Sequence, residues 1–247
     1  MVSHALRRAD CVTCDAEHMV AELVALSARE DRVSVINFGV DTDLFRPGSG
    51  DDSLRQTIGL ADGPVVVSLR SLTALYDVRT LMRVVPLVVE KVPGAMFVVA
   101  GDGEERPRLK KLFSSLGVVE HVRFIGQIPN KELPRYLNLS DVYVSTALSD
   151  AGLAASTAEA MACGLPAVVT HFGDNGEWVQ DGVNGYLFPP GDAEALASRL
   201  VDLLCDTGKR RRFGDAGRKV IVERNNYEVQ MGKMERIYVE LIERYKQ

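Results

Sequence analysis

The sequence predicts an α/β protein built on an open, doubly wound parallel sheet. Apolar runs of strand length alternate with longer segments of helical period, which is the pattern of repeated strand-helix units. The runs are short or nearly continuously apolar, as expected of parallel strands whose two faces are both buried. The seven expected strands are residues 33–36, 65–68, 96–100, 122–124, 142–144, 167–170 and 185–188.

Six segments of helical period accompany these strands. In a doubly wound sheet, ligands bind outside the carboxyl ends of the strands, so we look for chemistry in the strand-to-helix turns. The expected helices are residues 79–91, 104–116, 131–139, 156–163, 193–205 and 227–245.

The composition is that of an ordinary folded protein. The chain has 247 residues, 46% hydrophobic and 26% charged, which excludes a disordered, fibrous or disulfide-stapled protein. With 29 basic and 34 acidic side chains the formal charge is −5, so no overall attraction to nucleic acid is expected. The basic run at residues 209–212 is interpreted as a solvated helical face entered from a loop, with a local phosphate or membrane contact as the alternative.

The sequence shows neither a membrane span nor a secretory signal. No stretch approaches the ~18 consecutive apolar residues of a transmembrane helix, and residues 1–10 lack the apolar segment of a signal peptide. We therefore predict a cytoplasmic protein, with peripheral contact at the inner membrane face left open. Four cysteines in a chain of this length fit reduced thiols in that compartment.

Cys11 and Cys14, with His18 nearby, have the spacing of a partial metal site. A closed zinc site needs four ligands, and the two remaining cysteines stand alone in the sequence. We therefore predict no metal here. Residues 10–14 are interpreted as a buried strand, and Asp15 as the cap of the helix that follows.

Residues 37–47 mark a boundary in the chain. They are rich in turn formers and follow an apolar strand, as a connection between two units would. The residues before them hold one helix and two short strands, which is too little to bury a core independently. Residues 1–36 are therefore expected to be the end of something larger.

Two turns at the carboxyl edge of the predicted sheet suit an anion. Residues 101–103 (GDG) follow one strand and open a helix, where free N–H groups and the helix dipole favour negative charge. A tight connection without a ligand is the alternative there. Arg70 follows another strand, where its guanidinium fork suits a diphosphate. The alternative for Arg70 is a surface side chain paired with Asp77.

The most informative segment is residues 149–166. Its small residues let a ligand approach the backbone, and Ser156 suits the cap of a helix whose N–H groups point at a phosphate. Glu159 lies one turn into that helix, placed to accept hydrogen bonds from vicinal ribose hydroxyls. A solvent-facing glutamate is the alternative, and the apolar residues around position 159 weigh against it.

Residues 151–166 resemble the signature of retaining GT-B glycosyltransferases of the large family 4. In that signature a glutamate and seven further residues precede a stretch that is similar to residues 159–166 (EAMACGLP). The resemblance covers nearly everything from about Val33 to the end of the chain. Four further segments match the family. Residues 37–47 resemble the interdomain linker and residues 101–103 the second nucleotide loop. Residues 122–128 resemble the strand and turn that hold the base, and residues 181–185 a late loop of the same domain.

The resemblance implies the C-terminal half of a GT-B fold, a Rossmann-like domain whose substrate is a UDP- or GDP-linked sugar. It implies transfer with retention of configuration and without a metal or other cofactor, the enzyme stabilising the leaving diphosphate electrostatically. Arg70 would hold the diphosphate and act in catalysis, Glu159 would bind the ribose, and Ile128 would lie beside the base. The other donor-binding residues that the resemblance implies are Gly103, Gly152, Leu153, Ala154 and Ala155.

Two positions of the donor site depart from the family pattern. Ala151 stands eight positions before Glu159, where the family has its first glutamate, and the adjacent Asp150 is expected to serve as the catalytic and donor-binding carboxylate if the loop carries one extra residue. Leu75 and Tyr76 stand where a lysine is expected. A diphosphate held by one cation is less stabilised than one held by two, so either an N-terminal group compensates or activity is reduced.

A larger departure concerns the acceptor half of the family fold, of which this chain resembles only the last helix and strand. Residues 1–36 resemble the last helix and strand of the acceptor domain, residues 37–205 the donor domain, and residues 206–247 helices that pack back on the acceptor domain. Without that half, the final helix is expected to expose apolar positions that an N-terminal domain, a partner chain or a homodimer would cover. These positions are Val229, Ile237, Val239, Leu241 and Ile242.

Two hypotheses for the function follow. The leading one is the donor-binding half of a retaining hexosyltransferase, which acts in glycan, glycolipid or small-molecule glycoside synthesis and needs an acceptor domain for transfer. The alternative is a non-catalytic nucleotide-sugar-binding or protein-interaction module, for which Ala151→Glu creates no activity. The sugar, the base and the acceptor are left open.

Overall fold

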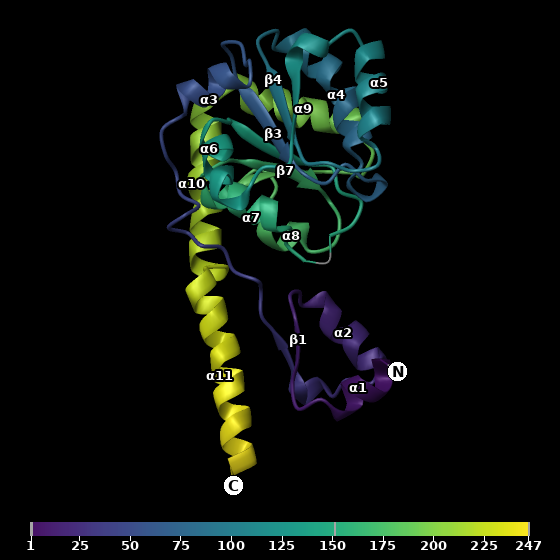
Figure 1. Ribbon diagram of the computed structural model, residues 1–247, viewed down its shortest axis with the longest axis vertical. Coiled ribbons are helices and arrows are strands. Elements are labelled where there is room, and N and C mark those ends of the chain that lie inside the picture. The colour runs from purple at the N-terminus through teal and green to yellow at the C-terminus, as the bar shows by residue number, and fades with distance from the viewer. Residues whose placement is uncertain (1, 151, 247) are drawn as a thin grey trace.

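The computed structural model describes residues 2–150 and 152–246, and within them six parallel strands form the main sheet (Figure 1). The strands are β3 (Val65–Leu69), β4 (Met96–Ala100), β5 (Val122–Gly126), β6 (Val142–Ser145), β7 (Ala167–Thr170) and β8 (Gly185–Phe188). Each one coincides with an expected apolar run to within two residues at either end.

The order of the strands is β5-β4-β3-β6-β7-β8, so the direction of winding reverses between β3 and β6. The chain runs outward from β3 to β5, returns to β6 beside β3, and runs outward again to β8. All pairings within this sheet are parallel. The predicted doubly wound α/β sheet is therefore confirmed, and its switch point lies between β3 and β6.

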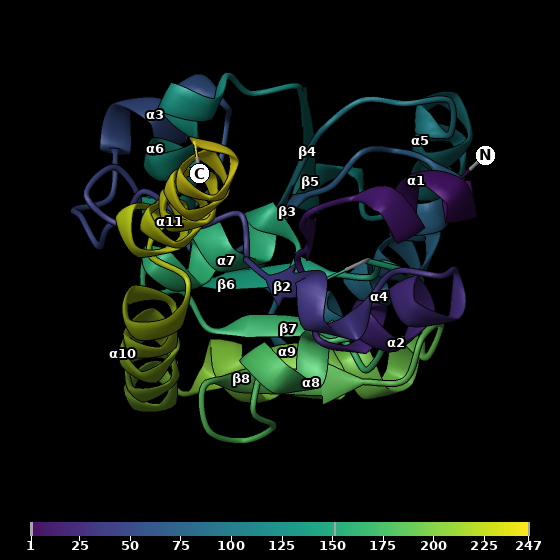
Figure 2. The same cartoon turned by 90° about the horizontal axis from the view of Figure 1, so that it is seen from below.

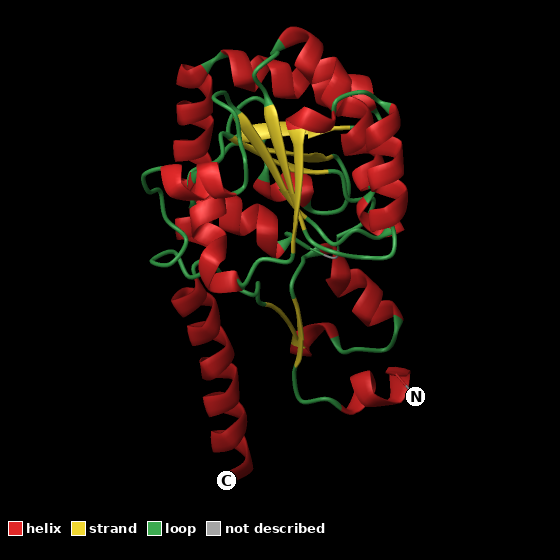
Figure 3. Cartoon of the chain, turned by 45° about the horizontal axis from the view of Figure 1, so that its top comes forward, coloured by secondary structure: helices red, strands yellow, loops and turns green. Residues whose placement is uncertain are grey.

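Helices cover both faces of the sheet (Figure 3). Alternate residues of a strand point to opposite faces, so Val66 of β3 joins one apolar core while Val65 and Val67 join the other. The core around Val66 is closed by α4 (Val78–Lys91), α5 (Arg106–Ser115) and α9 (Ala193–Cys205). The other core is closed by α3 (Asp52–Thr57), α6 (Leu133–Asn138), α7 (Ala155–Ala162), α8 (Asn175–Trp178) and α10 (Thr207–Arg224). Short 3-10 turns lie at Glu30–Arg32, Ala74–Tyr76, Val119–His121 and Asn130–Glu132.

The N-terminal elements form a second, smaller sheet. Strand β1 (Val12–Cys14) pairs in parallel with β2 (Val33–Val35), flanked by α1 (Val2–Arg8) and α2 (His18–Ala25). Counting residues 33–36 among the strands of the doubly wound sheet was therefore wrong. The turn-rich residues that follow β2 lead the chain away from this pair to the main sheet, as Figure 2 also shows.

The start of α2 differs from the expected one. The helix begins at His18, and Glu17 occupies the N-cap position without a side-chain cap bond. Asp15 is too far upstream to cap it, so the predicted capping role of Asp15 is wrong. The backbone carbonyl of Asp15 instead accepts a hydrogen bond of 2.7 Å from the Asn37 side chain.

The basic run at residues 209–212 lies in the first turns of α10 and not in a loop. The helix begins at Thr207 because the Asp206 side chain accepts a hydrogen bond of 2.8 Å from the Lys209 backbone. The Lys209 ammonium pairs with Asp202 at 2.7 Å. Arg210 donates to the last carbonyls of α9, at residues 203 and 204. The other two arginines of the run are exposed, as a solvated helical face requires.

The last helix, α11 (Tyr227–Lys246), extends from the body in the same direction as the N-terminal elements (Figure 1). Val229, Val239 and Ile242 are each about half exposed, so the predicted exposed apolar surface is confirmed. Ile237 and Leu241 are half-buried. Among the described residues, no helix combines the length and the apolar composition needed to cross a bilayer.

Candidate functional site

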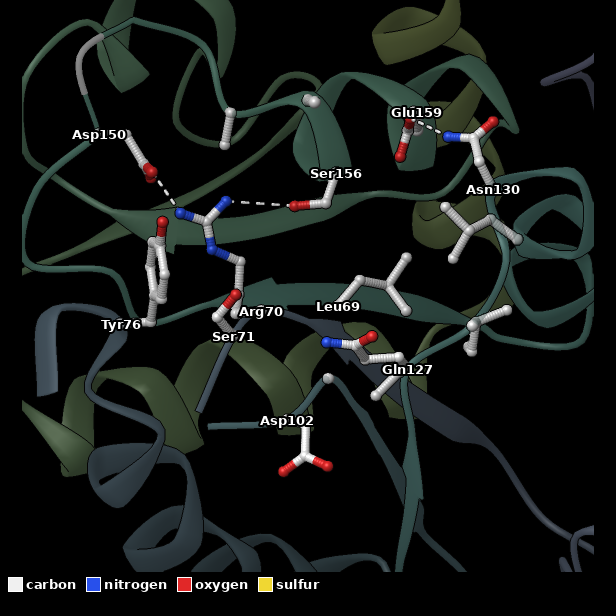
Figure 4. Close-up of a pocket in the computed structure, with 16 residues that line it drawn as sticks. Leu69, Arg70, Ser71, Tyr76, Asp102, Gln127, Asn130, Asp150, Ser156 and Glu159 are labelled. Carbon is white, nitrogen blue, oxygen red and sulfur yellow. Dashed lines mark hydrogen bonds and ion pairs between the residues drawn. The ribbon is translucent and has the colours of Figure 1, made fainter. Parts of the chain in front are cut away.

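A cavity of about 520 Å³ opens at the switch point of the sheet (Figure 4). Its wall is made by the turns that follow β3, β4, β5 and β6 and by the first turns of α7. These turns converge because parallel strands end at one edge of the sheet, which is where ligands bind in doubly wound folds. The cavity is therefore the candidate ligand site.

Arg70 forms one end of the cavity, directly after β3. Its side chain is only 8% exposed and pairs with the carboxylate of Asp150. A second guanidinium nitrogen, Nη1, donates to the Ser156 hydroxyl at 3.2 Å, and the Tyr76 ring lies 4.1 Å from the guanidinium carbon. The Nε–H of Arg70 has no hydrogen-bond partner among the described residues. Arg70 is thus a buried cation whose Nε–H is left without a partner in the described part of the chain.

The alternative pairing of Arg70 with Asp77 is wrong. Asp77 turns its carboxylate to the Thr80 hydroxyl, which donates to it at 2.6 Å. Asp77 has φ of 39°, in the left-handed region, and it does not line the cavity. Arg70 therefore finds its carboxylate partner on the loop after β6.

Burial shapes the acidity of Asp150. Its side chain is 14% exposed, and burial raises the pKa of Asp150 above its usual range although the charge of Arg70 acts in the opposite direction. Removing either partner of such a pair leaves an uncompensated charge out of water. Arg70 and Asp150 therefore depend on each other.

Glu159 forms the opposite end of the cavity, on α7 (Figure 4). The Asn130 side chain, which comes from the segment after β5, donates to its carboxylate at 3.4 Å. Burial raises the pKa of Glu159 to about 7. The cavity thus has a cation at one end and, at the other, a carboxylate that changes its charge near neutral pH.

The wall between these two ends is made by both polar and apolar residues. Leu69, Ile128 and Leu133 contribute to it, and α7 begins at its edge with Ala155. The predicted capping of α7 by Ser156 is wrong, because Ala154 holds the N-cap position. Ser156 lies inside the helix, where its hydroxyl contacts Arg70 and, at 2.8 Å, the Tyr143 hydroxyl.

The structure places six of the predicted site residues around this one cavity. They are Arg70, Ile128, Asp150, Ala154, Ala155 and Glu159.

Gly103, Gly152 and Leu153 do not line the cavity. The Gly103 N–H donates to the Asp102 carboxylate at 2.8 Å, and a Cβ on Gly103 would lie 2.4 Å from the Leu72 carbonyl oxygen. Glycine is thus required there to let the turn pack closely. Leu153 is buried in the apolar core, and Gly152 packs against the N-terminal segment.

The expectation for Ala151 lies outside the described residues. Its neighbour Asp150 reaches the cavity, in contact with Arg70.

Several polar groups of the site escaped the sequence analysis. The sequence indicates Tyr76 only as a residue in the place of a lysine. In the structure its ring stacks on Arg70. No sequence pattern marks Asn130 as a site residue. It reaches Glu159 only in the folded chain, where the segment after β5 lies beside α7. Asp102 and Gln127 also line the cavity; they lie within residues 101–103 and 122–128, the expected nucleotide loop and base-holding turn, although neither was singled out there.

The raised pKa of Glu159 predicts a dependence of stability on pH. The unfolded carboxyl titrates near 4.5 and the folded one near 7, so between these values the unfolded chain releases its proton first. Stability should therefore fall as pH rises from 4.5 to 7, by about 2 to 3 kcal/mol, and then level off. Urea unfolding of wild type and Glu159→Gln at pH 5 and pH 8 measures this, since the variant lacks the titrating group. An equal change in both proteins would contradict it.

Comparison with known proteins bears on the identity of this site. Residues 51–220 match the family model described as Glycosyl transferases group 1. A GDP-mannose-dependent alpha-(1-6)-phosphatidylinositol monomannoside mannosyltransferase of Mycolicibacterium smegmatis is 35% identical over 187 residues, which are 73% of this chain and 49% of the relative. A D-inositol 3-phosphate glycosyltransferase of Thermomonospora curvata is 34% identical over 218 residues, 77% of this chain and 50% of the relative.

Solved structures give the same fold. Anabaena HepE in complex with UDP-glucose has a TM-score of 0.87 at 24% identity, over 97% of this chain and 66% of that chain. The likeness shows a GT-B type of fold. The chain spans about half the length of the two curated relatives above.

Proposed function

Because this chain belongs to the glycosyl transferases group 1 family, we propose that its cavity holds the nucleotide-sugar donor of a retaining glycosyltransferase of family 4. One observation carries the proposal: a buried arginine and a half-buried glutamate line opposite ends of a single cavity at the switch point (Figure 4). A nucleoside diphosphate has the complementary pattern, with anionic phosphates at one end and hydroxyl donors on the ribose.

Arg70 would bind the diphosphate and stabilise the charge that develops on it when the bond to the sugar breaks. Its place at one end of the cavity supports this role, because Nη1 and Nη2 carry N–H groups beyond the two that Ser156 and Asp150 accept. Arg70 is itself largely removed from water, where its interaction with an anion is stronger than in solution. Asp150 would take the place of the family's first glutamate beside the sugar.

Glu159 would accept hydrogen bonds from the ribose hydroxyls, with Asn130 orienting its carboxylate. Ile128 would lie against the base, and the backbone at Ala154 and Ala155 near the phosphates and the sugar. Both UDP and GDP are candidates for the nucleotide. The Anabaena protein is described with UDP-glucose and the mycobacterial relative as GDP-mannose-dependent.

The domain assignment is part of the proposal. Residues 37–205 would form the donor domain, residues 1–36 would belong to the acceptor side, and residues 206–247 would link the two. The exposed apolar positions of α11 support a contact with an acceptor-binding unit. Transfer to an acceptor would then require that unit.

Calorimetric titration tests the donor site. UDP, GDP, ADP, UDP-glucose and GDP-mannose are each titrated into the purified chain, with uridine and guanosine as controls. We expect saturable binding of one nucleoside diphosphate and its sugar, and binding of the matching nucleoside at least about tenfold weaker because it lacks the charge-assisted contacts. Absence of saturable binding for every nucleotide at millimolar concentration would contradict the proposal.

One observation favours the alternative of a binding module without catalysis. Arg70 is the single cation among the described residues that line the cavity, and it is already paired with Asp150. With an acceptor domain supplied, such a module would bind the nucleotide sugar without releasing the nucleoside diphosphate. An increase in that release for Ala151→Glu would instead indicate an enzyme with a weakened site.

A further inference from the structure

Arg70 and Asp150 form an ion pair, and both residues belong to the wall of the cavity. Both side chains are largely buried, at 8% and 14% exposure, and both line the cavity. Three carboxylates line the described wall, those of Asp102, Asp150 and Glu159, and the one that contacts the arginine is Asp150. The charge that would attract a phosphate is thus already neutralised from within the protein.

The guanidinium has a limited number of donors to share. The Nη2 group is used by Asp150, Nη1 contacts Ser156, and Nε has no partner among the described residues. A phosphate binds a guanidinium best through two parallel N–H groups, as a carboxylate does. Because Nε is closed off from solvent, a diphosphate has to bind through Nη1 and Nη2, the side of the fork where Ser156 and Asp150 already lie.

The position of the guanidinium itself is well fixed. The Tyr76 ring stacks on its face at 4.1 Å, and the Tyr76 carbonyl accepts a hydrogen bond of 2.8 Å from the Thr146 hydroxyl. The arginine cannot easily swing away from the carboxylate to meet a ligand. A turn of the Asp150 side chain would free Arg70 without breaking this stacking.

The backbone at Asp150 is closely packed on one side. A Cβ on Gly173 would lie 3.1 Å from the Asp150 carbonyl oxygen. A rotation of the Asp150 side chain releases Arg70 without moving this carbonyl.

We propose that Asp150 occupies the place on Arg70 that a donor diphosphate takes, so that this carboxylate competes with the donor and must turn away when the donor binds. The inference rests on the donor site proposed above and adds an internal competitor to it. The ligand class that Asp150 opposes is the nucleoside diphosphate or its sugar ester. A nucleoside without phosphates is not opposed. Once displaced from Arg70, the carboxylate is free for the role beside the sugar that is proposed for it above.

The test is the affinity of Asp150→Asn for UDP, GDP, uridine and guanosine, measured by calorimetry on the full chain. Removing the charge should tighten binding of the nucleoside diphosphate by about tenfold, since repulsion between like charges and competition for Arg70 both disappear. The affinity for the nucleoside should not change. Asp77→Asn is the matched control, because it removes the same charge next to Tyr76 from a side chain that bonds Thr80 instead.

The outcomes separate the two proposals. Tighter binding confined to diphosphates, or binding by the variant alone, supports the competitor. Equal or weaker diphosphate binding by Asp150→Asn than by wild type overturns it and leaves the donor site standing, with Asp150 as an ordinary ligand. Absence of binding by both proteins overturns the donor site as well. If Asp150→Asn does not fold, as judged by its thermal unfolding, Asp150→Ser takes its place with the same expected result.

Discussion

Replacing Arg70 with alanine is expected to weaken nucleoside diphosphate binding by about 100-fold or more, because charge-assisted bidentate contacts are among the strongest hydrogen bonds in proteins. Arg70 is the single cation among the described residues of the cavity wall, so no neighbouring side chain there can replace it. The substitution also leaves Asp150 buried without its partner. Calorimetric titration of the variant measures the loss directly.

Arg70→Lys is the control that separates charge from geometry. Lysine keeps the positive charge but loses the planar fork and the stacking on Tyr76, so an intermediate loss of about tenfold is expected. Binding of the nucleoside should fall little in either variant. If Arg70→Ala bound the diphosphate as tightly as wild type, Arg70 would have no part in holding it.

The largest effect on stability is expected where α10 crosses the connection after α7. A Cβ on Gly214 would lie 1.9 Å from the Gly164 carbonyl oxygen, which is backbone and cannot rotate away. Gly214→Ala should therefore separate the two elements and lower the free energy of unfolding by about 3 kcal/mol or more. Urea unfolding measures this loss. Because α7 carries Glu159, nucleotide binding should weaken too.

Gly217 provides a matched control in the same helix. A Cβ there would meet its nearest neighbours, the Asn184 carbonyl oxygen and Met161, at 3.6 Å, an ordinary contact distance. Gly217→Ala should leave stability unchanged or raise it by about 0.5 to 1 kcal/mol, because alanine favours the helix more than glycine does. Equal stability of the two variants would contradict the close approach at Gly214.

The strands of the main sheet could be predicted because each carries its signal locally. Buried parallel strands are apolar on both faces, so the expected residues 167–170 and 185–188 coincide with β7 and β8. Helix α9 was predicted at its true bounds, and the Asp192 side chain caps it by accepting from the Ala195 N–H at 2.9 Å.

Helix α10 was expected only in outline, as a helical face at residues 209–212 within the helices of residues 206–247, and its bounds were not predicted because its signal is not local. Its sequence is strongly polar and contains three glycines, and it shows no clear apolar period. It is held by close packing, with Gly214 against Gly164 and Ile221 fully buried in the core. Sequence periodicity reports on neighbours along the chain, and these contacts join segments about 50 residues apart.

In the candidate site too, some residues could be predicted from the sequence and their contacts could not. Arg70 and Glu159 could be predicted, since a charged side chain at the carboxyl edge of a parallel sheet suggests a phosphate or ribose contact. Their partners could not. Arg70 meets Ser156 across 86 positions and Asp150 across 80, and Asn130 meets Glu159 across 29. The arrangement of the strands alone brings these residues together.

The most direct test of the central claim is a crystal structure of the chain with the nucleoside diphosphate that binds it most tightly. The account predicts the diphosphate on Arg70, the ribose hydroxyls within hydrogen-bond distance of Glu159, and the Asp150 carboxylate turned away from the guanidinium. A nucleotide bound outside this cavity, or with its phosphates at the Glu159 end, would contradict it.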